Sequence, residues 1–266
     1  MPYLGTLYSH SDGMAFAGEN DTYSVPKINW LDDWISYRIG ENRNVLAMYV
    51  GGTGTGKSYA ALSTALMRDP DFDIHRVVFS VSDFLNEMKI MKKGEVIIFD
   101  DAGLGVASKD WRETQVKVFG KVTQSFRFKQ LITLMTTPDM TFIENTSRKL
   151  INILFQADDV KQGLFYPKIP YTPRNYNSNN IVTYFAYPRI HINGMSVQVK
   201  RIRFPLVPSS IADEYEKLKA NFIENYYDKY AKDIEKLNNR KNGKKKMNPK
   251  SLANLKQNRN KSTPDD

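Results

Sequence analysis

A glycine-rich run between residues 51 and 58 has the residue types and the spacing that bind phosphate groups in proteins. It matches the pattern G-x-x-x-x-G-K-[ST] through Gly51, Gly52, Thr53, Gly54, Thr55, Gly56, Lys57 and Ser58. Glycines let backbone N–H groups turn toward an anion where a Cβ atom would collide with it. Lys57 would bring a cation to the outer phosphates, and Ser58 a hydroxyl ligand to Mg²⁺. Residues 51–58, with Tyr59 beside them, are therefore predicted to bind a nucleoside triphosphate, with ATP and Mg²⁺ as the cofactors.

Such a loop requires a strand before it and a helix after it, and the sequence predicts both. The apolar residues 45–50 predict a buried strand, and residues 59–67 predict a helix whose positive end would point at the same anion. The alternative is a Gly/Thr-rich turn followed by an incidental Lys-Ser pair, which would explain neither flanking element.

Two adjacent carboxylates end a second apolar strand, at residues 96–99. Because this strand would end at the same edge of the sheet as the glycine-rich loop, Asp100 is predicted to hold Mg²⁺. Asp101 is the candidate to orient or deprotonate an attacking water molecule. A solvated carboxylate in a turn is the alternative for Asp101.

Two threonines follow another apolar strand, at residues 131–135. Thr136 would lie beside the γ-phosphate if this strand neighbours the one that ends at Asp100. The competing explanation is a turn-forming threonine near Pro138, and the sequence leaves both open.

Short strands alternate with helices through the first 159 residues, which predicts an α/β fold with a mainly parallel sheet covered on both faces. Further strands are expected at 77–81 and 151–155, and further helices at 28–39, 84–91, 115–128 and 142–149. Later, the runs 181–187 and 197–204 predict a β-hairpin around Asn193-Gly194. Ser209 and Ser210 would cap a long helix, whose apolar stripe is Ile211, Tyr215, Leu218, Phe222, Tyr226, Tyr230, Ile234 and Leu237.

The glycine-rich loop, the acidic strand end and the threonine strand end together resemble the additional-strand class of P-loop ATPases. Within that class, residues 131–138, Ile143-Glu144 and residues 148–151 are similar to the DNA-pumping motors of the FtsK–HerA type. They are similar in particular to the zonula-occludens-toxin-like ATPases of viruses and plasmids. The resemblance covers about residues 45–156. In one departure, Asp100-Asp101 stands where such motors usually carry Asp-Glu, and the shorter side chain would draw the water closer or slow hydrolysis.

The resemblance implies a RecA-like P-loop NTPase fold, ATP hydrolysis, a homo-oligomer that could be a hexameric ring, and movement of DNA. It also implies that an arginine of one subunit acts on the γ-phosphate held by its neighbour. Arg148 is the first candidate because of its spacing after the Thr136 strand, and Arg127 is the second. An ordinary surface ion pair is the alternative for each arginine.

The excess positive charge belongs to the C-terminal residues and not to the core. The net charge is +9, and residues 240–261 contain nine basic and no acidic residues, so the rest of the chain is neutral. This basic tail is predicted to be disordered and to neutralise nucleic-acid phosphates, with a solubilising tail as the alternative. Residues 165–176 interleave aromatic and basic side chains, as binders of single strands do, although such a stretch could also pack on its own domain.

Composition excludes several classes of site and predicts a soluble protein. With no cysteine and three scattered histidines, the chain has no disulfide and no thiolate or zinc spacing. Neither a membrane-spanning run nor a signal peptide is expected, so a cytoplasmic location is predicted, in the host if the protein is viral. The five predicted parts are an N-terminal extension (1–44), the P-loop core (45–159), a β-rich extension (160–207), a helix (208–239) and a disordered basic tail (240–266).

Three functions fit these observations. The first is an ATP-driven motor that translocates or packages nucleic acid, the second an ATPase switch in replication initiation or helicase loading, and the third a non-catalytic module that binds ATP and nucleic acid. A GTPase is disfavoured. Residues 100–103 fit D-x-x-G, but residues 136–139, where the guanine-reading motif N-K-x-D could fall, lack its lysine.

Overall fold

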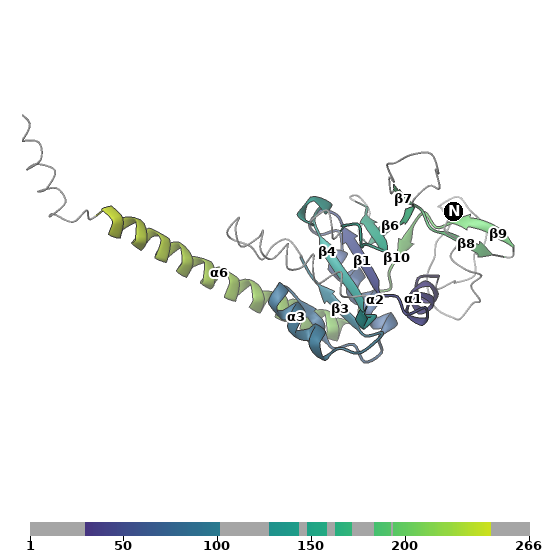
Figure 1. Ribbon diagram of the computed structural model, residues 1–266, viewed down its shortest axis with the longest axis horizontal. Helices are drawn as coiled ribbons and strands as arrows, with labels where there is room; N and C mark the ends of the chain where they lie inside the picture. Colours follow the sequence, from purple (N-terminus) through teal and green to yellow (C-terminus); the bar gives the residue numbers. More distant parts are fainter. Residues whose placement is uncertain are drawn as a thin grey trace, which may run out of the picture. The chain divides into compact units, whose positions relative to one another are not determined.

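The computed structural model describes residues 30–101, 128–143, 148–158, 163–171, 184–192 and 194–245 (Figure 1). The chain divides into two units, Met1–Lys217 and Leu218–Asp266. The helices are α1 (Trp30–Gly40), α2 (Lys57–Arg68), α3 (Val81–Ile90) and α6 (Ser209–Lys245), with short 3-10 helices η1 (Ile74–Arg76) and η2 (Met140–Phe142). The strands are β1 (Val45–Val50), β2 (Val77–Val78), β3 (Val96–Phe99), β4 (Ile132–Thr137), β5 (Ile153–Ala157), β6 (Leu164–Tyr171), β7 (Tyr184–Ala186), β8 (Arg189–Ile192), β9 (Met195–Gln198) and β10 (Ile202–Arg203).

The main sheet has eight strands in the order β10-β6-β5-β1-β4-β3-β2, with β7 paired to β6. The strands from β5 to β2 are parallel, whereas β6, β7 and β10 join antiparallel. β4 lies between β1, which leads into the glycine-rich loop, and β3, which ends at the acidic pair. This is the mainly parallel α/β sheet that the sequence predicts.

Helices cover both faces of the parallel strands, so these strands are buried almost throughout. On one face, Leu46 and Met48 of β1 share a core cluster with Phe84 of α3. Tyr49, on the opposite face because side chains alternate along a strand, bonds Thr64 of α2. The core thereby fixes the strand ends that meet at the loop.

Most predicted elements of the parallel part are present, with shifted ends. β2 stops at Val78, shorter than the predicted strand 77–81, because Ser80 caps the N-terminus of α3 by accepting a hydrogen bond from Asp83 N. β4 continues through both threonines, and β5 starts two residues later than predicted. Residues 115–127 of one predicted helix and 144–147 of another lie outside the described residues.

The β-rich part differs more from the prediction. Residues 164–171 form the strand β6 although they contain Pro167 and Pro170, which lack the N–H that a strand donates. The hairpin predicted around Asn193-Gly194 is present as β8 and β9, with Ile192 paired to Met195. The predicted ranges 181–187 and 197–204 are wrong as the arms of this hairpin, which are 189–192 and 195–198. Strands β7 and β10 do lie within the two predicted ranges, and residues 181–183 lie outside the described part.

Helix α6 extends to Lys245, and this corrects the prediction that the disordered tail starts at residue 240. Lysine and arginine favour helices, and extending a formed helix costs little per residue, so residues 240–245, four of which are basic, continue it. Within the residues that the structure describes, no helix is both long and apolar enough to cross a lipid bilayer.

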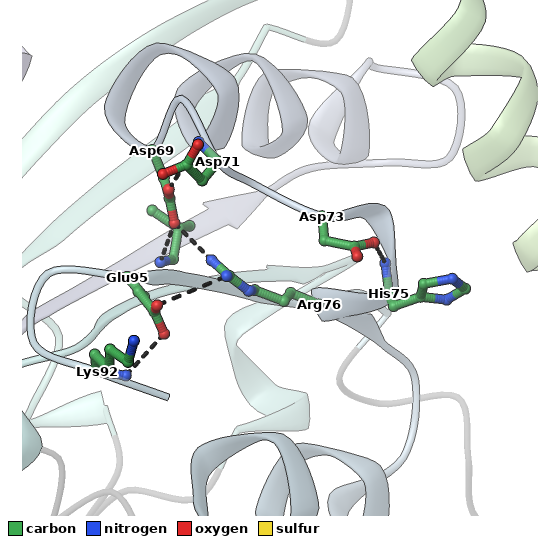
Figure 2. Close-up of polar contacts among 8 residues, drawn as sticks. Asp69, Asp71, Asp73, His75, Arg76, Lys92 and Glu95 are labelled. Carbon is green, nitrogen blue, oxygen red and sulfur yellow. Dashed lines mark hydrogen bonds and ion pairs between the residues drawn. The ribbon is translucent and has the colours of Figure 1, made fainter. Parts of the chain in front are cut away.

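A polar network ties the end of α2 to the start of β3, at the edge of the sheet opposite the strand ends that carry the acidic pair (Figure 2). Arg76 donates to Asp69 at 2.7 Å and lies 3.7 Å from Glu95. Asp69 also accepts a hydrogen bond from the backbone N–H of Val96. Because a buried carboxylate needs such partners, this network is explained by stability alone.

Candidate nucleotide-binding site

The glycine-rich loop connects β1 to α2, and its two pattern glycines are required by the backbone. A Cβ atom on Gly51 would lie 2.5 Å from the Cβ of Ala157 in β5, closer than two non-bonded carbon atoms can approach. Gly56 precedes α2 with φ of 88°, in the left-handed region that glycine adopts at no steric cost. The loop therefore turns sharply between strand and helix, as a phosphate-binding loop must.

The lysine of the loop is held inside it. The Lys57 side chain is buried, with 7% of its surface exposed, and its Nζ donates to the carbonyl oxygen of Gly52 at 2.6 Å. Thr55 Oγ1 donates to the same carbonyl at 2.9 Å. Phosphate oxygens are stronger acceptors than a carbonyl, so a bound triphosphate would compete for the protons of this ammonium group.

Asp100 is fully buried and accepts three hydrogen bonds from hydroxyl groups. Ser58 Oγ and Thr136 Oγ1 each donate to its Oδ1 at 2.7 Å, and the Tyr215 hydroxyl donates to its Oδ2 at 2.7 Å. The structure thus brings together Ser58 and Asp100, the two residues that the sequence predicts as Mg²⁺ ligands.

This pair fits a magnesium ion. Mg²⁺ binds proteins through one or two oxygen ligands and takes its remaining ligands from phosphates and water. In the part of the chain that is described, no group of three or more His, Asp or Glu side chains could hold a metal by itself. A magnesium ion at Ser58 and Asp100 would therefore depend on the nucleotide for most of its ligands.

The second carboxylate and the threonine strand end lie beside Asp100. The backbone N–H of Asp101 donates to Thr136 Oγ1 at 2.8 Å, and Asp101 has φ of 49°, a left-handed conformation that Asp tolerates better than most residues. Thr136 is fully buried, and because its Oγ1 also donates to Asp100, it links the two acidic residues. Its predicted contact with a γ-phosphate, and the role of Asp101 as a base, stay predictions.

Arg148, the first candidate for a trans-acting arginine, makes a local contact with the backbone in the single chain. Arg148 Nε donates to the carbonyl oxygen of Ile143 at 2.7 Å. The pKa of the Asp139 carboxyl is lowered, chiefly by the hydrogen bond from the backbone N–H of Thr141, with a smaller contribution from the charge of Arg148. Arg127 lies outside the described residues.

The aromatic stretch 165–176 is in part a core strand, as its packing alternative expects, and its role as a nucleic-acid surface stays a prediction. Phe165 is fully buried and contacts Tyr49 and Phe204 with ring centroids 6.1 and 5.5 Å away. Tyr166 donates to Asp158, and this hydrogen bond is the main cause of its raised pKa. Phe165 is excluded from base stacking because alternate residues of β6 face the core; residues 172–176 lie outside the described part.

Sequence reasoning missed Tyr215 as a site residue. It belongs to the apolar stripe predicted along the C-terminal helix, but nothing in its spacing signals a carboxylate partner 115 residues earlier. Tyr59, predicted to line the nucleotide, donates to Glu216 Oε1 at 2.8 Å, next to Tyr215. The start of α6 is thus part of the surroundings of the loop.

Comparison with models of protein families finds no match, and neither does comparison with curated protein sequences. Among solved structures, the chain is similar to the N-terminal domain of zonular occludens toxin from Neisseria meningitidis, with 11% identity, a TM-score of 0.30, and coverage of 54% of this chain and 94% of that one. It is also similar to B204, the DNA-packaging ATPase from Sulfolobus turreted icosahedral virus, with 13% identity, a TM-score of 0.33, and coverage of 56% and 100%. A third similarity is to a RuvB variant from Thermotoga maritima, with 14% identity, a TM-score of 0.32, and coverage of 47% and 43%. The assignment of the site rests on its own residues and on the order of the strands.

Proposed function

We propose that this protein is an ATPase that hydrolyses ATP with Mg²⁺ at the site formed by residues 51–59, Asp100, Asp101 and Thr136. The observation that carries the proposal is the 2.7 Å hydrogen bond between Ser58 and Asp100. These residues are 42 positions apart in the chain, and they meet where β1 and β3 end. A phosphate loop without the acidic partner could bind an anion, but the pair provides the ligands for the ion that accompanies ATP.

In this proposal each residue has one task. Backbone N–H groups of the loop bind the phosphates, and Lys57 binds their outer oxygens and stabilises the charge that grows there. Mg²⁺, when bound with the nucleotide, offsets phosphate charge. Asp101 orients a water molecule for attack and takes its proton, and Thr136 fixes the backbone of Asp101 through the 2.8 Å hydrogen bond.

The work driven by this hydrolysis is proposed to be movement of nucleic acid, with DNA translocation or packaging for a virus or plasmid as the specific task. Support comes from nine basic residues between 240 and 261 that no acidic residue offsets. A homo-oligomer, with a ring of six subunits as one form, and a trans-acting Arg148 or Arg127 belong to the same proposal. The proposed location is the cytoplasm, of the host if the protein is viral.

Steady-state ATP hydrolysis with and without duplex and single-stranded DNA tests this function against the two alternatives. A motor is expected to hydrolyse ATP faster when DNA is present. Slow turnover together with ATP-dependent assembly on DNA would instead favour a switch for replication initiation or helicase loading. Binding of ATP without any turnover would favour a non-catalytic module.

Removal of the basic C-terminal residues is expected to weaken DNA binding and to flatten its dependence on salt. Each lost phosphate contact should reduce the slope of log K against log salt by roughly 0.7–0.9. Two truncations separate the contributions: deletion of 246–266 keeps all of α6, and deletion of 240–266 also removes the basic end of the helix. Fluorescence anisotropy with labelled DNA over a salt series measures both quantities, and an unchanged slope in both proteins would reduce this segment to an aid to solubility.

A further inference from the structure

The first two turns of α6 pack against the nucleotide site through one buried side chain. Of residues 209–217, only Tyr215 is buried, with 2% of its surface exposed. An amphipathic helix that docks only for packing usually buries apolar residues along its stripe. Here the buried position holds a tyrosine, and Ile211, one turn earlier on the same stripe, is only half-buried.

The Tyr215 hydroxyl reaches the carboxylate that is proposed to hold Mg²⁺. It donates to Asp100 Oδ2 at 2.7 Å, the short distance typical of a hydrogen bond to a charged acceptor. Ser58 and Thr136 both donate to the other oxygen, Oδ1. Both oxygens of the Asp100 carboxylate therefore accept hydrogen bonds, and the Tyr215 hydroxyl is a donor to Oδ2.

Two neighbouring contacts hold Tyr215 in this position. Its ring lies edge-on to the ring of Tyr59, with the centroids 5.9 Å apart. The Tyr59 hydroxyl donates to Glu216, the residue after Tyr215. Tyr59 directly follows Ser58. Its contacts with Tyr215 and Glu216 therefore connect the proposed phosphate-binding loop to the start of α6.

We propose that Tyr215 is a positioning residue that orients Asp100 for Mg²⁺, so that the start of α6 is a structural part of the nucleotide site. This inference rests on the proposed ATPase function. The torsion that turns a carboxylate about its last bond is broad, so contacts at only one oxygen leave its orientation loosely defined. A donor at the second oxygen fixes the plane of the carboxylate, and such partners of a metal ligand typically change metal affinity by about 10- to 100-fold.

Tyr215→Phe tests the proposal because it removes the hydroxyl and keeps the ring that packs on Tyr59. The measurement is binding of a fluorescent, non-hydrolysable ATP analogue during titration with MgCl₂, at a temperature below the unfolding transition of every protein compared. We expect the Mg²⁺ concentration for half-maximal enhancement of binding to rise about tenfold or more, with little change in the affinity measured without Mg²⁺.

Two control variants separate this role from general destabilisation. Tyr49→Phe removes another fully buried tyrosine hydroxyl, whose 2.7 Å hydrogen bond goes to Thr64. Glu214→Ala removes an exposed side chain next to Tyr215 in the same helix and leaves both the three donors to Asp100 and the contacts of Tyr59. Both are expected to keep the Mg²⁺ midpoint within about twofold of wild type. A tenfold shift of the midpoint would correspond to a change of about 1.4 kcal/mol in binding free energy.

A Tyr215→Phe midpoint equal to that of wild type would overturn the positioning role, and so would an equal shift in Tyr49→Phe. Nucleotide binding by wild-type protein that does not respond to Mg²⁺ would overturn the proposed function itself. The two failures are therefore distinguishable.

Discussion

Lys57→Ala protein is expected to lose ATP hydrolysis, by at least about 10³-fold. The ammonium group is buried within the glycine-rich loop and bonded to Gly52, so it belongs to the proposed phosphate site. Alanine leaves no cation to stabilise the charge that develops on the transferred phosphoryl group, and water has little access to replace it. Release of inorganic phosphate under saturating ATP and Mg²⁺ measures the effect.

The matched control is Lys89→Ala, which removes an equal charge from α3. Lys89 is exposed, and its ammonium group donates to Asn86, three residues earlier in the same helix. Its rate should equal that of wild type. Thermal unfolding of both variants checks that the fold is kept. Near wild-type turnover by folded Lys57→Ala protein would contradict the assignment of the phosphate site.

Asp101→Asn is expected to slow hydrolysis by roughly 10²-fold or more while binding of ATP and Mg²⁺ stays close to that of wild type. Asparagine keeps the shape of the side chain, and the backbone N–H that bonds Thr136 is unaffected. What is lost is a group able to accept a proton from water. Single-turnover hydrolysis, together with equilibrium binding of a non-hydrolysable analogue, separates the chemical step from binding.

Asp100→Asn provides the contrast, because this residue is bonded to Ser58 and is proposed to hold the metal. It should weaken the Mg²⁺-dependent part of nucleotide binding. Asp83→Asn, on an exposed site of α3, serves as a control for the loss of one carboxylate. Normal turnover in Asp101→Asn protein would show that another residue acts as the base. The departure from the usual Asp-Glu pair at this strand end would then indicate that Asp101 does not take the role of the glutamate.

The sequence by itself determined the glycine-rich loop, the parallel strands around it and the acidic strand end. These features are local: an apolar run gives a buried strand, Gly51 and Gly56 give the sharp turn, and Asp100 ends its strand. Once strands are parallel, their carboxyl ends meet at one edge, so the approach of Ser58 to Asp100 could be predicted without coordinates. Local periodicity also predicted α1, α2 and α3 to within a few residues.

Only the tertiary structure decided which partners these residues have. The pairing of β6 overrode the two prolines within it, and burial assigned Phe165 to the core although its spacing suggested a surface for bases. Tyr215 is the clearest case, because its partner Asp100 is 115 residues away in the chain. An apolar stripe along a helix predicts that its residues are buried, but it does not predict which residue they contact. The physical reason is that secondary structure follows from neighbours in the chain, whereas a hydrogen bond between distant side chains depends on how whole elements pack.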